Sequence, residues 1–140
     1  MSISHQTQPT PDSCMSTCLA MILDVPASQV IDEFHERYKS NYKRASAYLQ
    51  EKGLCPSPRN VEDRQLWSDR VYLLAVPSLN IDGGMHSVVA DTRNDETRIL
   101  DPNRGREGRR YYREQHKPKE PLGELESDLN GWVIELEVWF

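Results

Sequence analysis

The chain has 140 residues, a formal net charge of −5 at pH 7, 28% charged residues and 37% hydrophobic residues. This length and composition predict one soluble globular domain, 1–140, that buries about two-thirds of its unfolded surface. No apolar run approaches the ~20 residues of a membrane span, and the N-terminus lacks the parts of a signal peptide. The negative net charge argues against a protein built to hold nucleic acid.

The first predicted helix begins at Cys14, and its start places a thiol in a favourable electrostatic position. Asp12 and Ser13 are good N-cap residues, and an apolar run at helical spacing follows them. The helix is expected to end near Asp24, because Pro26 disfavours helical backbone in the residue before it. Cys14 therefore lies in the first turn, where free N–H groups and the positive end of the helix dipole favour a thiolate.

Two more helices are predicted before the strands begin. One runs over 26–38, and the next runs over about 43–52 and ends at Gly53 as its C-cap. The apolar face of the helix over 26–38 consists of Val30, Ile31, Phe34 and Tyr38. The Pro-rich segment 54–58 predicts a short edge strand or a loop.

The second half of the chain predicts strands. The nearly continuous apolar run 71–76 predicts a central strand, and the segments 85–91 and 97–101 predict a hairpin across a polar turn. The alternating segment 132–140 predicts a closing strand that belongs to the core rather than to a dimer edge. Helices first and strands later indicate an α+β domain, with N-terminal helices packed on a C-terminal antiparallel sheet.

Four polar residues occur in an order that suits nucleophilic catalysis by a thiol. Gln8 lies shortly before Cys14, His86 opens the apolar strand 85–91, and Asp101 ends the following strand. An imidazole beside a thiol can hold the pair as thiolate and imidazolium and then protonate a leaving amine. An acid behind the second ring nitrogen orients the imidazole, and main-chain or amide N–H groups can hold an oxyanion.

This pattern resembles the papain-like cysteine peptidases, and more narrowly the branch of bacteriocin-leader peptidases with its small bacterial and phage relatives. That branch carries a Gln, then a Cys at a helix start that continues in an apolar run like 18–23. It later carries a His that opens a hydrophobic strand and an Asp-Pro pair some fifteen residues beyond, as His86 and Asp101-Pro102 do here. The likeness covers roughly residues 3–103.

The resemblance implies a papain-like α+β fold in which the helix that bears the cysteine packs against the sheet that bears the histidine. It implies a thiol protease that needs no cofactor. By the same resemblance, Gln8 is the oxyanion donor, Cys14 the nucleophile, His86 the base and Asp101 the acid that orients the base.

The chain departs from the family pattern at the start of the helix. Met15 stands where such domains usually have Gly after the nucleophile, and the Asp that usually precedes the Cys directly is displaced to Asp12. The substrate-binding residues are expected around the two ends of the site, at Met15 and at Gly83, Gly84 and Met85. The glycines would let a substrate backbone approach closely, since no side chain blocks the groove.

The remaining cysteines and histidines have simpler interpretations. Cys18 lies one helical turn after Cys14 and is expected in the core, and Cys55 is expected to be an ordinary loop or edge thiol. The other histidines are predicted surface residues: His5, His35 and His116. The cysteine spacing does not match structural zinc sites, so neither a metal nor a cofactor is predicted. An odd number of thiols suits a reducing, cytoplasmic setting.

Segment 104–119 forms a predicted basic loop with Tyr111 and Tyr112 in its middle. Basic and aromatic side chains together can bind nucleic acid or an acidic substrate tail. Because the whole chain is acidic, a solvated mobile loop that borders the site is the favoured interpretation, and nucleic acid is an unlikely partner.

Three functions remain open from the sequence. The first is a cysteine peptidase or isopeptidase, a hydrolase that cleaves an amide bond of a peptide or protein through an acyl-enzyme. The second is an amidase or acyl transferase that acts on a small molecule by the same chemistry. The third is a papain-like binding module that has lost turnover. The sequence indicates no membrane partner and leaves the oligomeric state open.

Overall fold

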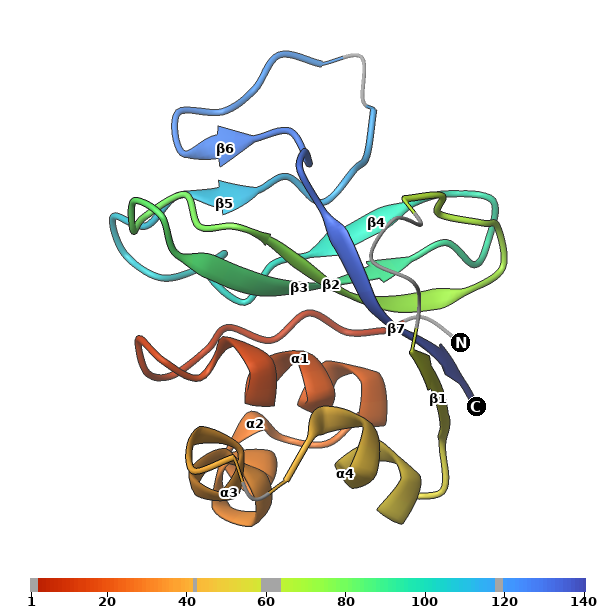
Figure 1. The fold of residues 1–140 in the computed structure, drawn as a ribbon. Helices are drawn as coiled ribbons and strands as arrows, with labels where there is room; N and C mark the ends of the chain where they lie inside the picture. The colour runs from red at the N-terminus through yellow and green to blue at the C-terminus, as the bar shows by residue number, and fades with distance from the viewer. Residues whose placement is uncertain (1–2, 42, 59–63, 118–119) are drawn as a thin grey trace.

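The computed structural model describes residues 3–41, 43–58, 64–117 and 120–140. Figure 1 shows the helices on one side of a five-stranded antiparallel sheet and a small two-stranded sheet on the other side. The helical elements are α1 (Cys14–Leu23), α2 (Ala27–Val30), a π-helical turn (Ile31–His35), α3 (Glu36–Lys39) and α4 (Ala45–Glu51). The predicted α+β class with N-terminal helices and an antiparallel sheet is therefore confirmed.

The large sheet has the strand order β1-β7-β2-β3-β4. Its strands are β1 (Cys55–Pro58), β2 (Val71–Pro77), β3 (Met85–Asp91), β4 (Arg98–Leu100) and β7 (Val133–Trp139). The apolar β2 is central, the Pro-rich β1 is an edge strand, and β3 with β4 forms the predicted hairpin. β7 lies between β1 and β2, so the closing strand belongs to the core, as predicted.

Both faces of the large sheet are covered. On the helical face, Leu19 of α1 and Phe34 belong to the same buried cluster as Leu73 of β2. On the opposite face, the neighbouring Leu74 belongs to a second cluster, which includes Tyr112. Successive side chains of a strand point to opposite faces of the sheet, so a run of consecutive apolar residues is fully buried only when both faces are covered. The two cores therefore explain the nearly continuous apolar sequence of β2.

The helix predicted over 26–38 is interrupted. Val30 and Phe34 are fully buried as expected, but the π-helical turn Ile31–His35, which contains Phe34, adds a residue to one turn. This shift turns His35 inward, where its ring contacts Ser16 Oγ at 3.3 Å and lies 3.5 Å from the Asp12 carboxylate. The prediction of a surface histidine at position 35 was therefore wrong.

The basic loop is more ordered than the sequence indicated. Within it, β5 (Tyr111–Tyr112) pairs in parallel with β6 (Glu126–Ser127), which the sequence did not predict. Tyr112 is buried, and so is Arg113, whose guanidinium contacts Asp128. Tyr112 and Arg113 therefore depart from the expected solvated loop, whereas most of the described remainder of 104–117 is exposed or half-buried; Lys119 lies outside the described residues.

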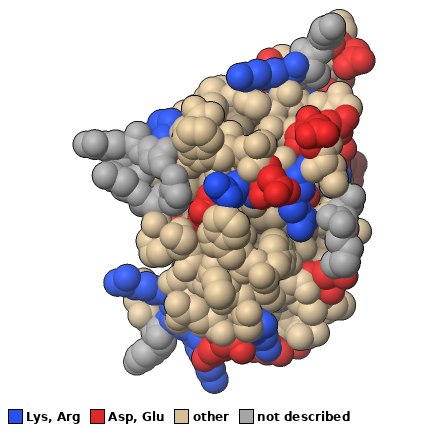
Figure 2. Space-filling model, turned by 90° about the vertical axis from the view of Figure 1, so that its right-hand side faces the viewer, with Lys and Arg blue, Asp and Glu red and all other residues tan. Residues whose placement is uncertain are grey.

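Charge is mixed on the face of the molecule that Figure 2 shows. Lys and Arg side chains lie there among Asp and Glu side chains, around a broad uncharged area. In the part of the chain that the structure describes, no single helix is long and apolar enough to cross a membrane. α1 together with Ala27–Lys39 reaches that length and composition, with a bend of 118° between the two.

Candidate active site

Cys14 is the first residue of α1, as the sequence predicted. Ser13 occupies the N-cap position, but its hydroxyl bonds to Thr10 in the preceding turn rather than to the helix. The first helical bond runs from the Thr17 N–H to the Ser13 carbonyl, so the Cys14 N–H has no acceptor within the helix. The thiol is half-buried, and a helix start of this kind favours its ionised form.

His86 joins the cysteine to an acid. It is the second residue of β3, where α1 packs on the sheet, and its Nε2 lies 2.6 Å from Asp101 Oδ1. The ring also interacts with the Cys14 thiol, which in turn interacts with Ser87. Because Nε2 is engaged with Asp101, Nδ1 is the ring nitrogen left for Cys14. The structure thus brings together three of the four predicted catalytic residues.

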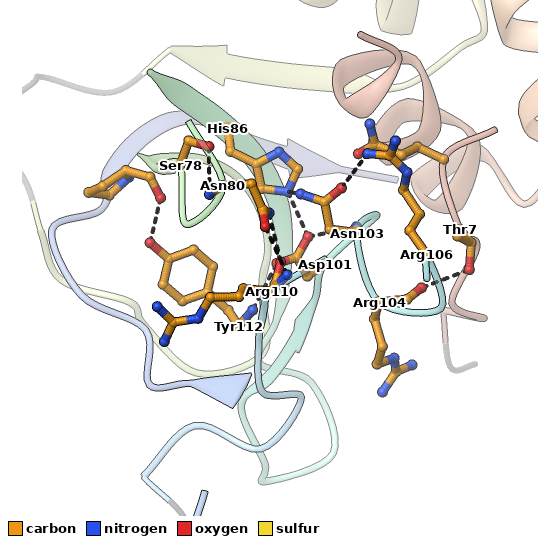
Figure 3. A network of polar contacts seen from close by, with 12 residues as sticks. Thr7, Ser78, Asn80, His86, Asp101, Asn103, Arg104, Arg106, Arg110 and Tyr112 are labelled. Carbon is orange, nitrogen blue, oxygen red and sulfur yellow. Dashed lines mark hydrogen bonds and ion pairs between the residues drawn. The ribbon is translucent and has the colours of Figure 1, made fainter. Parts of the chain in front are cut away.

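Asp101 is held by main-chain donors as well as by His86. It follows β4 directly and is buried. The Asn103 N–H donates to its Oδ1 at 2.8 Å, and the Tyr112 N–H donates to its Oδ2 at 2.8 Å. Figure 3 shows His86, Asp101 and Asn103 turned toward one another. A carboxylate with these donors is fixed in place and stays an acceptor for the imidazole.

The electrostatics of the pair favour the ionised forms. Burial raises the pKa of the Cys14 thiol, but the hydrogen bond and positive charge of His86, with contacts from Ser87, outweigh burial and bring this pKa below its usual value. Burial lowers the pKa of His86, but the hydrogen bonds to Asp101 and Cys14 and the charges of both raise it to about 9. Both shifts favour the thiolate and imidazolium forms of the pair.

Gln8 does not direct its amide to the thiol in this structure. The side chain is buried, and its Nε2 donates to the carbonyl oxygens of Thr10 at 2.8 Å and Pro11 at 3.2 Å. Gln8 thereby braces the turn that leads into Cys14. Its Oε1 has no hydrogen-bond partner among the described residues. An oxyanion role for Gln8 stays a prediction, and it requires the amide to turn away from Thr10 and Pro11.

The other two cysteines differ from Cys14 in environment. Cys18 is fully buried in the helical-side core, as predicted, and burial raises the pKa of its thiol well above the usual value. Cys55 is an exposed thiol on the edge strand β1, again as predicted. The chain therefore contains internal references for a thiol that is exposed and for one that is inaccessible.

The four predicted substrate-binding residues come from two elements, the β2–β3 turn that precedes His86 and the start of α1 that follows Cys14. Gly83 and Gly84 belong to the turn between β2 and β3, in which the Gly84 N–H donates to the Ile81 carbonyl. Gly83 has a φ of +72°, which favours glycine, and Met85 is largely exposed. Met15 is buried at the start of α1 and contributes to the lining of a surface hollow.

Sequence reasoning missed several residues that support the acid. The His5 ring contacts the Asp101 carbonyl oxygen at 2.7 Å, and Arg106 donates to Asn103 Oδ1 at 3.0 Å. His5 is partly buried rather than a plain surface residue, and so is His116. The short turn after Asp101-Pro102 was a usable signal for Asn103, because Asp-Pro-Asn favours a tight turn. The contact of the Tyr112 N–H depends on the fold of 104–119 and had no signal.

The basic loop is fastened to the elements around the site. Asn80, in the β2–β3 turn, exchanges two hydrogen bonds with the main chain of Arg110, each of 2.9 Å. Thr7 donates to the Arg104 carbonyl at 2.8 Å, and both contacts are visible in Figure 3. Arg104 itself pairs with Glu114. Part of the positive charge of this loop is therefore used within the protein.

Metal ligation and sequence relatives give no further assignment. Within the described ranges, no group of three or more His, Cys, Asp or Glu side chains is arranged to hold a metal ion. No protein-family model matches the chain, and no curated protein is significantly similar to it in sequence.

Proposed function

We propose that the protein is a cysteine peptidase-like hydrolase of the papain-like kind, which cleaves an amide bond through an acyl-enzyme at Cys14. The observation that carries this proposal is the position of His86 between the Cys14 thiol and the Asp101 carboxylate. Three residues from α1, β3 and the end of β4 meet there in the order nucleophile, base and orienting acid. The helices on one face of the antiparallel sheet also suit a papain-like arrangement.

The proposed mechanism uses the ionised pair. The Cys14 thiolate attacks the acyl carbon, and the Cys14 N–H at the helix start donates to the developing oxyanion. His86 gives its proton to the leaving amine, which leaves a thioester on Cys14 and a neutral imidazole. The imidazole then takes a proton from water as the water attacks the thioester; the C–S bond breaks, the product acid leaves, and the thiolate–imidazolium pair is restored. Asp101 keeps the ring oriented throughout.

A peptide-binding domain without turnover is the second candidate. The observation that favours it is the Gln8 amide, whose two hydrogens are directed at loop carbonyls instead of at the site. A free thiol beside an imidazolium could then still react with electrophiles, while amide hydrolysis would lack one oxyanion donor.

For either candidate, three unpaired cysteines suit a reducing compartment, and we propose a cytoplasmic location.

A small activated ester tests the proposal. With 4-nitrophenyl acetate, we expect a burst of about one equivalent of nitrophenolate per chain and one acetyl group on the peptide that contains Cys14. Cys14→Ala should abolish the burst, and the matched change Cys55→Ala should leave it intact. Acetylation of Cys55 or of lysines alone would contradict the proposal, and a burst without later turnover would favour the second candidate.

A further inference from the structure

Strand β7 contains one extra residue, at Glu135. Leu136 pairs with Leu73 and Ile134 pairs with Leu74, so Glu135 has no partner on β2. The bulge changes the face that each side chain meets: Leu136 belongs to the helical-side core, whereas Ile134 belongs to the core on the opposite face. Bulges of this kind redirect single side chains and are frequent beside active sites.

The side chain of Glu135 lines a surface hollow on the helical side. The hollow has a volume of about 450 Å³, and Met15, Tyr38 and Leu136 form its apolar wall. The Tyr38 hydroxyl is close enough to both Glu135 and Cys14 for their charges to raise its pKa, after the larger effect of burial. Met15, the residue after the nucleophile, lines one part of the hollow, and Ala45 and Ser46 at the start of α4 line another.

Among the described residues, no cation is paired with the Glu135 carboxylate. Burial raises its pKa, and no other group contributes to that shift. No hydrogen bond or ion pair joins it to any of the described residues. Lys43 and Arg44 also line the hollow, but Lys43 is paired with Glu51, and Arg44 is an exposed residue before α4. A half-buried carboxylate without a partner is costly, and a cation from a ligand would relieve that cost.

We propose that this hollow is a side-chain subsite that takes a lysine or arginine of a peptide substrate, with the cationic head at Glu135. The aliphatic stem of such a side chain would lie against Met15 and Tyr38, and the cation would meet the carboxylate at the inner end. The Tyr38 ring adds a face suited to a cation. This inference rests on the proposed function, because the subsite would bind a side chain of the same peptide whose amide bond Cys14 attacks.

Peptide chloromethyl ketones test the subsite, with the labelling rate of Cys14 as the readout. The set consists of alanine-based peptides that carry either Lys or norleucine at one of the last three positions. At one of these positions we expect the Lys probe to label Cys14 roughly tenfold to 100-fold faster than the norleucine probe. Glu135→Gln should abolish this preference, and iodoacetamide labelling of Cys14 reports the reactivity of the nucleophile separately.

Glu137→Gln is the matched control, since Glu137 lies on the same strand but is already paired with Arg70. It should retain the preference for Lys, and Glu135→Lys should reverse it in favour of a Glu-containing probe. Equal rates for Lys and norleucine at all three positions, or a Lys preference that survives Glu135→Gln, would overturn the subsite alone. Iodoacetamide labelling of Cys14 no faster than that of Cys55 would overturn the proposed function, and the subsite with it.

Discussion

Replacing Asp101 with Asn is expected to slow the acylation of Cys14 by roughly 100-fold to 10⁴-fold. The carboxylate accepts from three N–H groups, those of His86, Asn103 and Tyr112. An amide has only one acceptor oxygen, so its NH₂ group must face a donor in either orientation. The imidazole then loses both its charge partner and its fixed orientation.

The same substitution is expected to narrow the pH range of activity from both sides. Reaction requires the thiolate and the imidazolium together, so the alkaline limit follows the loss of the His86 proton, whose pKa is raised to about 9. Without the Asp101 charge, this pKa falls and the alkaline limit moves to lower pH. Less imidazolium also raises the Cys14 pKa, which moves the acid limit to higher pH. The pH dependence of the nitrophenolate burst measures both limits.

Asp91→Asn provides the matched control for this experiment. Asp91 is equally buried and lies at the other end of β3, where it pairs with Arg93. Its replacement removes a buried carboxylate but leaves the pH limits of acylation in place. A profile for Asp101→Asn that keeps the width of the wild-type profile would contradict the role assigned to Asp101.

Replacing His86 with Ala is expected to reduce the acylation rate by roughly 10²-fold to 10⁴-fold. The change removes the hydrogen bond and the positive charge that oppose the effect of burial on the Cys14 thiol, so the pKa of this thiol rises. It also removes the proton donor for the leaving group. Stopped-flow measurement of the burst at pH 7 gives the rate for each variant.

His116→Ala is the control for the loss of a partly buried imidazole. Its ring stacks edge-on against Trp132, and its environment includes neither Cys14 nor Asp101. This variant should acylate at the wild-type rate. An equal loss of rate in both variants would indicate a general effect on the fold rather than a role of His86 in the reaction.

The sequence predicted the elements that carry the site well, because each has a strong local signal. Asp12-Ser13 before an apolar run marks the start of α1, and the opening of β3 at Met85-His86 marks a strand boundary. Cys14, His86 and Asp101 each stand at such a boundary. Their convergence follows from the packing of α1 on β3 and from the hairpin of β3 with β4.

Features that depend on tertiary contacts were not predictable from local patterns. Residues 133–138 alternate so regularly that a uniform strand is the natural interpretation, with Ile134 and Leu136 on one face. The structure places them on opposite faces, and each is buried in the core that covers its face. Because both faces of the sheet are covered, an apolar residue at position 134 would be buried on whichever face it lay. The bulge that redirects Glu135 thus leaves no mark on the hydrophobic pattern.

The orientation of a single polar side chain was equally beyond the sequence. Gln8 occupies the expected place before Cys14, but its amide hydrogens satisfy two carbonyl groups of the intervening turn. The Gln8 side chain is buried, so its amide needs acceptors, and it finds them in this turn. Position in the chain therefore indicated proximity to the site, while the local demand for hydrogen bonds decided where the amide points.

The pH dependence of iodoacetamide labelling, followed at each cysteine by mass spectrometry, tests the central claim most directly. At pH 6.5 we expect Cys14 to label roughly tenfold faster than Cys55, since its thiolate persists below the usual thiol range. Cys18 should remain unlabelled in the folded protein, and His86→Ala should bring Cys14 to the rate of an ordinary thiol. A Cys14 that labels no faster than Cys55 at any pH, and that does not respond to His86→Ala, would contradict the account.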